Sequence, residues 1–244
     1  MTDTLTVPDQ VPQVEITEKQ KEINGVVKEL ADKTPEQVAE MILADRERIA
    51  KLEQLVETDE KTPLLNERGW INRTPVEFAR GAHHREPVAS FKIDLDKLKY
   101  INDKISYDDG DKYLKLFGSV MLATFRKGDI LSHRSGDEFY AQSVGMSEER
   151  AEAVAAELSK NMEDVINLQM PENDFFPVIQ AAARDNVQLG ASVGFQVKEW
   201  SASDNIPSNR ADFEEYVNYE LSKNNKQADR NMQANKKARR VTRE

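Results

Sequence analysis

Apolar positions recur with helical spacing from about Val14 to Val56. Within this span, residues 34–37 (TPEQ) predict a new helix start, with a threonine cap, proline in the first turn and glutamine placed for a capping box. The positions that follow are alternately four and three residues apart and include one polar residue: Val38, Ile42, Asp45, Ile49, Leu52 and Val56. This heptad seam predicts either a helix that packs on its own domain or a coiled coil with a second copy of the chain, and both alternatives stay open.

After Thr58 the pattern changes to strands interleaved with helices. Apolar runs and alternation predict strands at residues 90–96, 130–134, 139–144 and 188–200, and the middle two flank SGDE as a β-hairpin. Helical spacing appears at residues 111–126, 147–166 and 211–238. These elements predict an α+β sandwich, in which helices flank a central, mostly antiparallel sheet. Residues 167–187 fit no clear pattern and are expected to be an insertion with a short helix.

Composition places limits on the class of protein. Of the 244 residues, 39% are hydrophobic and 32% are charged, which fits one core with much solvated helix. We expect a disordered segment at 1–13, a helical dimerisation segment at 14–57 and the main domain at 58–240. The net charge of −10 disfavours nucleic-acid binding, and the absence of cysteine excludes disulfides and thiolate metal sites. With no membrane-length apolar run and no signal-peptide core, a cytoplasmic protein is expected.

The sequence HRSGDEFYAQ, residues 133–142, places Gly136, Asp137 and Glu138 on a tight turn between two strands. An ordinary polar hairpin is one interpretation, and a metal site is the other. Asp94 and Asp96 alternate on the strand KIDLD and therefore point to the same face. If that strand lies beside the hairpin, Asp94 and Asp137 converge, and their repulsion requires a cation. Oxygen ligands without histidine or cysteine favour Mg²⁺.

Six segments, in order, resemble the GGDEF family of diguanylate cyclases. They are residues 59–68 (DEKTPLLNER), 94–103 (DLDKLKYIND), 110–111 (GD), 135–139 (SGDEF), 192–194 (SVG) and 228–240, with Ala228, Asp229, Lys236 and Arg240 as its matches. The resemblance implies a palm-like nucleotidyl cyclase fold. It also implies that two GTP molecules are condensed into cyclic di-GMP, with release of two pyrophosphates, across a homodimer that holds two Mg²⁺ ions per site, or alternatively Mn²⁺.

The resemblance also assigns residues to roles. The ions would be held by Asp94, the backbone carbonyl of Leu95 and Asp137, and Glu138 would act as a further ligand or as proton acceptor. Guanine would be read by Asn102 and Asp111, whose alternative roles are a turn residue and a helix N-cap. Phosphates would be contacted by Lys99, Lys236, Arg240 and the loop residues Ser135 and Gly136. For the lysines, the alternative is solvated surface charge.

The segment from Arg126 to Asp129 matches the family's R-x-x-D product-inhibition site, five residues before the signature loop. Arginine can stack on guanine and pair with phosphate, so cyclic di-GMP feedback is one hypothesis. The other is that the two side chains frame the turn before the strand.

Four departures from the family pattern bear on activity. Ser135 replaces the first loop glycine, and His133 and Arg134 replace the usual arginine and aromatic residue. Ser106-Tyr107 replaces Gly-His. In the last helix, Asn231, Gln233 and Arg239 replace a small apolar residue, tyrosine and glycine, so that this helix is expected to end differently and to shift Arg240. The alternatives to a diguanylate cyclase are a degenerate domain that senses GTP or cyclic di-GMP, a cyclase making another cyclic dinucleotide, and a coiled-coil scaffold.

Overall fold

The computed structural model describes residues 13–31, 33–167 and 175–241. The chain divides into two compact units, residues 1–54 and 55–244. Most of the predicted disordered segment, residues 1–12, lies outside the described part of the chain. Within the described ranges, no helix combines the length and the apolar character needed to cross a bilayer.

The first unit is helical, as its spacing predicts. It contains α1 (Gln13–Ala31) and most of α2 (Pro35–Glu57). The capping box is confirmed, since the Gln37 amide donates to Thr34 Oγ1 at 3.3 Å and the Thr34 amide donates to Gln37 Oε1 at 2.9 Å. Along α2, the seam residues Ile42, Ile49 and Leu52 are 49%, 54% and 53% exposed, so the seam is an apolar stripe that is about half open to solvent.

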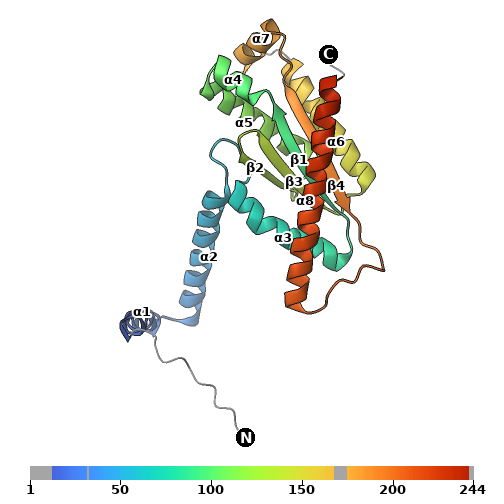
Figure 1. Ribbon diagram of the computed structural model, residues 1–244. Coiled ribbons are helices and arrows are strands. Elements are labelled where there is room, and N and C mark those ends of the chain that lie inside the picture. The colour runs from blue at the N-terminus through green and yellow to red at the C-terminus, as the bar shows by residue number, and fades with distance from the viewer. Residues whose placement is uncertain (1–12, 32, 168–174, 242–244) are drawn as a thin grey trace. The chain divides into compact units, whose positions relative to one another are not determined.

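The second unit contains one four-stranded sheet (Figure 1). Its strands are β1 (Val88–Asp96), β2 (Ile130–Ser135), β3 (Glu138–Val144) and β4 (Gly190–Lys198), in the order β2-β3-β1-β4. Every neighbouring pair is antiparallel, which confirms the predicted fold class. The register pairs Asp94 with Glu138 on one side and with Ser192 on the other.

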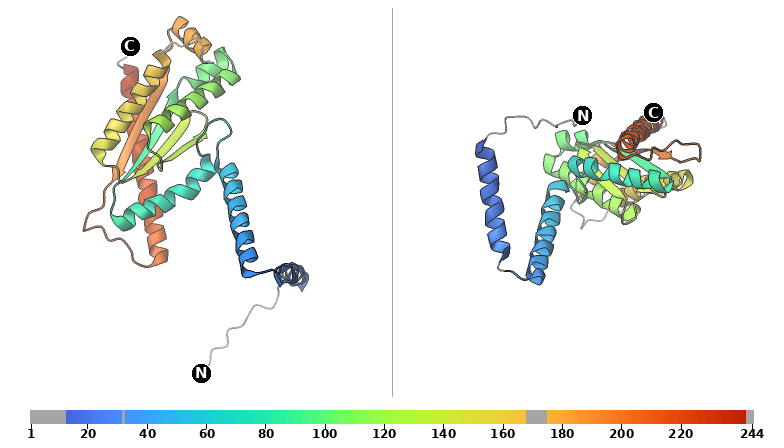
Figure 2. Two further views of the ribbon diagram at one scale, coloured as in Figure 1. Left: turned by 180° about the vertical axis from the view of Figure 1, so that it is seen from behind. Right: turned by 90° about the horizontal axis from the view of Figure 1, so that it is seen from below.

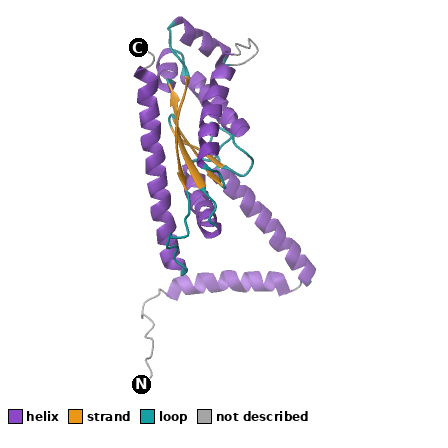
Figure 3. Cartoon of the chain, turned by 90° about the vertical axis from the view of Figure 1, so that its right-hand side faces the viewer, coloured by secondary structure: helices purple, strands orange, loops and turns teal. Residues whose placement is uncertain are grey.

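Helices cover both faces of this sheet (Figures 2 and 3). One face packs against α4 (Leu98–Lys104), α5 (Tyr107–Thr124) and α6 (Glu148–Asn167), and α7 (Phe176–Arg184) joins the same core. The other carries α3 (Glu67–His84) and α8 (Arg210–Val241). Because β1 side chains alternate, Phe91, Ile93 and Leu95 enter the core, whereas Lys92 and Asp94 face α8. The short helix expected within 167–187 is α7, and residues 168–174 lie outside the described chain.

The last helix continues through its departures from the family pattern, because α8 runs to Val241. It covers β4, an edge strand whose backbone groups need partners. Asn231 Nδ2 donates to the Phe195 carbonyl at 2.7 Å, and Asn235 Nδ2 donates to the Val193 carbonyl at 2.8 Å. The residue that looks out of place in the family pattern, Asn231, therefore fastens the helix to the sheet.

Close packing of α8 on β4 depends on Gly194. A Cβ atom there would lie 2.0 Å from the Met232 nitrogen and 2.5 Å from the Ala228 carbonyl oxygen. Both are backbone atoms, so α8 would have to move as a whole. We expect Gly194→Ala to lower the free energy of unfolding by about 2–3 kcal/mol, measured by denaturant titration. Gly25→Ala in α1, where an added methyl meets nothing within 4 Å, is the control and should not destabilise. Equal midpoints for the two variants would contradict the packing role.

Candidate active site

The signature sequence SGDEF forms the turn between β2 and β3. Gly136 and Asp137 are the two loop residues, and Gly136 has φ of +56°, which glycine adopts without strain. Ser135 lies at the end of β2, outside the left-handed region, so replacing the usual glycine there costs no backbone strain. The Leu95 amide donates to the Asp137 carbonyl at 2.8 Å and joins the turn to the central strand.

Asp94 is brought close to this turn by the β1–β3 register. It is 8% exposed and forms an ion pair with Lys236 of α8. Burial raises the pKa of Asp94, the Lys236 ammonium lowers it and the charge of Asp137 raises it, with a net increase. The two carboxylates therefore lie near enough to repel each other, and the ammonium supplies the positive charge that Asp94 needs.

Glu138 faces a second lysine. Lys92 Nζ lies 3.0 Å from Glu138 Oε1 and 3.1 Å from Asp229 Oδ1. Burial lowers the pKa of Lys92, but hydrogen bonds with Tyr140, Glu138 and Asp229 outweigh it and raise the pKa. Lys92 thus stays charged and holds Glu138 beside Asp94, so two lysine–carboxylate pairs stand side by side on this face.

No group of three or more histidine, aspartate or glutamate side chains with metal-binding geometry occurs in the described ranges. Three carboxylates lie at or beside the turn, Asp94, Asp137 and Glu138, and the Leu95 amide is hydrogen-bonded to the Asp137 carbonyl. Carboxylate and carbonyl oxygens are hard ligands, and the negative charge of Asp94 is balanced by the Lys236 ammonium. The donor set fits a divalent ion such as Mg²⁺ that takes its remaining ligands from water and phosphate.

A cavity of about 640 Å³ opens beside the turn. Asn102 from α4 and Asp111 from α5 lie in its wall, and Ser135 and Gly136 form another part of it. The cavity has the size of a nucleotide site. Ser106, with its Oγ accepting from the Asp109 amide at 3.1 Å, is the N-cap of α5, so Asp111 is not a cap, and Asn102 is helical rather than in a turn.

The structure therefore gathers most of the predicted site residues around one turn: Asp94, Leu95, Asn102, Asp111, Ser135, Gly136, Asp137, Glu138 and Lys236. Lys99 is exposed in the first turn of α4. Arg240 belongs to α8, but its side chain lies outside the described residues. The roles of all these residues stay predictions.

The family model for the diguanylate cyclase GGDEF domain matches residues 56–177, half of the chain. The chain belongs to the GGDEF family. Among curated relatives, the cyclic di-GMP phosphodiesterase NbdA of Pseudomonas aeruginosa is 29% identical over 120 residues, which are 49% of this chain and 15% of that protein. The diguanylate cyclase DgcP of Escherichia coli is 30% identical over 87 residues, 36% of this chain and 26% of that protein. The GGDEF chain thus spans about a quarter or less of the length of these relatives.

Solved GGDEF structures share the fold. The coiled coil and GGDEF domain of DgcB from Caulobacter crescentus, in complex with c-di-GMP, has a TM-score of 0.53 and 18% identity, covering 71% of this chain and 83% of that one. The diguanylate cyclase SiaD of Pseudomonas aeruginosa, in complex with its activator SiaC, has a TM-score of 0.53 and 18% identity, covering 93% of this chain and 76% of that one. At such identity, the likeness establishes the fold alone.

The R-x-x-D segment of this GGDEF domain is engaged internally. Arg126 Nε lies 3.1 Å from Asp129 Oδ1, and the Arg126 amide donates to Asp129 Oδ2 at 3.1 Å. The Asp129 carboxylate is 2% exposed and also accepts from Ser143 Oγ. These contacts agree with the hypothesis that Arg126 and Asp129 frame the turn before the strand. Product binding by Arg126 and Asp129 stays a prediction and requires both side chains to exchange these partners.

Sequence reasoning missed three residues beside the turn. Lys61 Nζ lies 2.7 Å from Asp111 Oδ1, and His133 lies between Asp59 and the Gly136 carbonyl. Asp59 and Lys61 belong to the family's opening segment, which was the available signal. The contacts themselves join residues 50 and 74 positions apart, and no local pattern encodes them.

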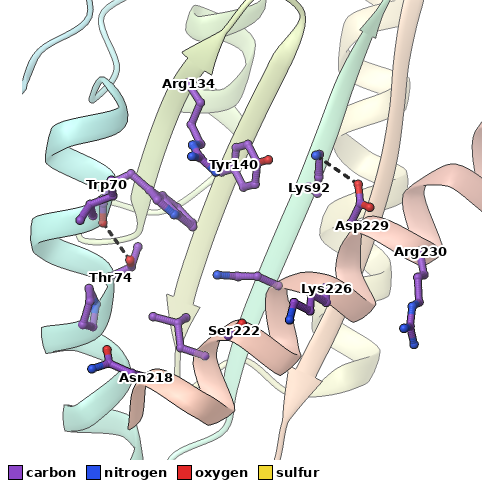
Figure 4. Close-up of a pocket in the computed structure, with 14 residues that line it drawn as sticks. Trp70, Thr74, Lys92, Arg134, Tyr140, Asn218, Ser222, Lys226, Asp229 and Arg230 are labelled. Atoms are coloured by element: carbon purple, nitrogen blue, oxygen red, sulfur yellow. Dashed lines mark hydrogen bonds and ion pairs between the residues drawn. The ribbon is translucent and has the colours of Figure 1, made fainter. Parts of the chain in front are cut away.

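A second cavity, of about 570 Å³, lies between α3 and α8 (Figure 4). Trp70 and Tyr140 have ring centroids 5.4 Å apart there, and Lys92 bridges to Asp229. Since Lys92 also holds Glu138, this cavity adjoins the candidate site, but neither Asp94 nor Asp137 lines it. Its walls come from helices far apart in the sequence, which is why no pattern predicted it.

The Asp94–Lys236 pair can be tested by a double-mutant cycle. Lys236→Met leaves a nearly buried carboxylate without its counter-charge, so we expect the free energy of unfolding to fall by about 1–3 kcal/mol. Asp94→Asn in the same background should recover part of this loss, giving a coupling energy of about 1 kcal/mol or more in denaturant titrations. Lys237→Met, at an exposed neighbouring position, is the control. Strictly additive effects would show that the pair does not interact.

Proposed function

We propose that this GGDEF domain is a diguanylate cyclase that condenses two GTP molecules into cyclic di-GMP and two pyrophosphates. One observation carries the proposal: the cavity lined by Asn102 and Asp111 runs directly onto the turn that bears Asp137, with Asp94 beside it. A base held in the cavity would have its phosphates over the backbone of Ser135 and Gly136. The base pocket, the glycine turn and the carboxylates follow one another in space. A bound nucleotide presents its base, its phosphates and its metal ions in the same order.

Guanine suits the base pocket. A carboxylate at Asp111 accepts from the N1–H and the exocyclic amine of guanine, and the Asn102 amide serves the remaining edge, whereas adenine lacks that donor pair. Asp111 now pairs with Lys61, and the two side chains are 46% and 50% exposed. Such an exposed pair contributes only about 0–1 kcal/mol, so guanine can displace Lys61 at little cost.

The charged side chains fit phosphoryl transfer. Asp94, Asp137 and the Leu95 carbonyl would hold two Mg²⁺ ions, or Mn²⁺, which supply charge neutralisation and lower the pKa of the attacking 3′-hydroxyl. Lys236 would turn from Asp94 to a phosphate oxygen, in line with the expected roles of Lys99 and Arg240. Glu138, oriented by Lys92, would accept the hydroxyl proton.

A homodimer completes the reaction, because each domain presents one GTP and the product joins two. The half-exposed seam on α2 supports pairing of two such helices, with Ile42, Ile49 and Leu52 facing a second copy. The solved DgcB structure also has a coiled coil next to its GGDEF domain. In this proposal, pairing through α1 and α2 raises the effective concentration of one half-site near the other, so that the dimer forms at lower protein concentration.

A sensor without turnover is the second candidate. The observation that favours it is the ion pair between Lys236 and Asp94, in which the ammonium stands where a metal ion would bind in a cyclase. Relatives named as phosphodiesterase and as cyclase both match this GGDEF segment, so the domain occurs in proteins of opposite activities. A cyclase making another cyclic dinucleotide is separated from both by the mass of the product formed from mixed ATP and GTP.

The direct test incubates the purified full chain with GTP and Mg²⁺ and measures cyclic di-GMP and pyrophosphate by mass spectrometry. We expect both products, and we expect Asp137→Asn to slow their formation by about a hundredfold or more, since several kcal/mol of charge stabilisation depend on that carboxylate. Asp164→Asn on the exposed face of α6 is the matched control and should leave the rate unchanged. GTP binding without product in the unaltered chain would instead establish the sensor.

Base recognition can be weakened without touching a polar group. A Cβ at Gly110 would lie 1.9 Å from Asn102 Oδ1, so Gly110→Ala should turn the amide away from the cavity. Loss of one hydrogen bond predicts an approximately tenfold higher KM for GTP, with little change in melting temperature. Ser119→Ala, on the exposed side of the same helix, is the control. An unchanged KM for Gly110→Ala would remove Asn102 from base recognition.

A further inference from the structure

His133 lies beneath the signature turn and makes three contacts. It is 4% exposed, and its ring stacks on Phe139 with centroids 4.6 Å apart. Its Nδ1 lies 3.0 Å from Asp59 Oδ1, and its Nε2 lies 2.9 Å from the Gly136 carbonyl oxygen. The imidazole therefore spans from the opening loop of the domain to the first residue of the turn.

Both nitrogens of this ring face acceptors. A carbonyl oxygen can only accept a hydrogen bond, and so can an ionised carboxylate. Burial raises the pKa of Asp59, but hydrogen bonds from His133 and Thr62 and the His133 charge outweigh it, so the pKa falls and Asp59 is ionised near neutral pH. A neutral imidazole has one N–H and can serve only one of the two acceptors. The geometry requires a proton on each nitrogen.

We propose that His133 is a positioning residue that, in its doubly protonated form, fixes the SGDEF turn for catalysis, and that loss of its second proton releases the turn. This inference rests on the proposed cyclase function for its effect on rate, whereas the protonation state rests on the two contacts of the ring and on the charge of Asp59. In the neutral ring, a nitrogen lone pair would face either the Asp59 carboxylate or the Gly136 carbonyl, and that contact becomes repulsive.

Release at Gly136 would act on the next residue, Asp137. The turn would still be held by the pairing of Ser135 with Glu138 and by the hydrogen bond from the Leu95 amide to the Asp137 carbonyl at 2.8 Å. Asp137 is also the carboxylate proposed to bind the ions, so a small rotation about Gly136 moves it relative to Asp94. The hold on the turn lasts while both ring nitrogens of His133 carry protons, and it is lost when one of them leaves.

Two ion pairs lie near the ring. Lys61 pairs with Asp111, and Arg134 pairs with Glu67. The titratable groups that share its cavity are Asp59, Glu60, Lys61, Tyr107, Asp111 and Arg134, and Asp137 lies on the adjacent turn. Of these, Asp59 is the one in direct contact with the imidazole, so it is the partner that stabilises the second proton.

Arginine, the residue of the GGDEF pattern at this position, offers the matched comparison. A guanidinium donates to several acceptors and stays charged over the whole working range of pH. His133→Arg should therefore hold the turn without titrating. His133→Phe keeps an aromatic ring against Phe139 but has no donor for either acceptor.

The first experiment reads the protonation state without using activity. The full chain, labelled with ¹⁵N in histidine, is followed by NMR across pH, and His133→Phe identifies the signal among the three histidines. We expect both ring nitrogens of His133 to carry protons at about pH 7, and Asp59→Asn to convert the ring to a single tautomer at the same pH. A single tautomer in the folded, unaltered chain at that pH would overturn the inference, whether or not the chain is a cyclase.

The second experiment compares pH profiles of cyclic di-GMP formation, with thermal melting at each pH to confirm folding. From about pH 7 to about pH 9, we expect kcat of the unaltered chain to fall about tenfold relative to His133→Arg, which is the cost of one lost hydrogen bond. His133→Phe should be slow at every pH. Parallel profiles for the unaltered chain and His133→Arg would overturn the positioning role. A chain that makes no cyclic di-GMP but shows the expected NMR signal would refute the proposed function and the effect on rate, and leave the protonation state established.

Discussion

The site depends on one register, that of β1 against β3. Pairing Asp94 with Glu138 brings the end of the central strand to the β2–β3 turn, and the Leu95 amide then bonds to the Asp137 carbonyl. A shift by one residue would turn Asp94 into the core and Leu95 toward α8, because strand side chains alternate. The register is therefore stabilised by the buried side chains of Phe91, Ile93 and Leu95, because a shift that moved the Asp94 carboxylate would also remove these three from the hydrophobic core.

Around that register, two acidic groups, Asp94 and Glu138, are each paired with a lysine. Asp94 takes Lys236 from the last helix, and Glu138 takes Lys92 from the neighbouring position of the central strand. Such pairs supply positive charge to carboxylates in a partly buried place and can be exchanged for a ligand of the right charge. The same arrangement serves a cyclase and a nucleotide sensor, and turnover distinguishes them.

Departures from the family pattern have physical consequences that can be read in the fold. Ser135 ends β2 outside the left-handed region of backbone conformation, so it leaves the turn without strain. Asn231 satisfies a carbonyl of the edge strand, and His133 replaces a permanent charge with a titratable one between Asp59 and Gly136. The first two preserve the geometry, and the third makes the hold on the turn depend on how many protons the ring carries.

The sequence by itself determined the strands, the main helices, the hairpin turn and the face of Asp94, because periodicity of two or 3.6 residues is a local property. It also determined the family, through motifs in a fixed order. Only the tertiary structure decided that Lys236 pairs with Asp94, that Asp129 is engaged within its own turn, and that α8 seals the edge strand. Those outcomes depend on which side chains, distant in the chain, meet when the two faces of the sheet are covered, and no spacing along the sequence encodes such a meeting.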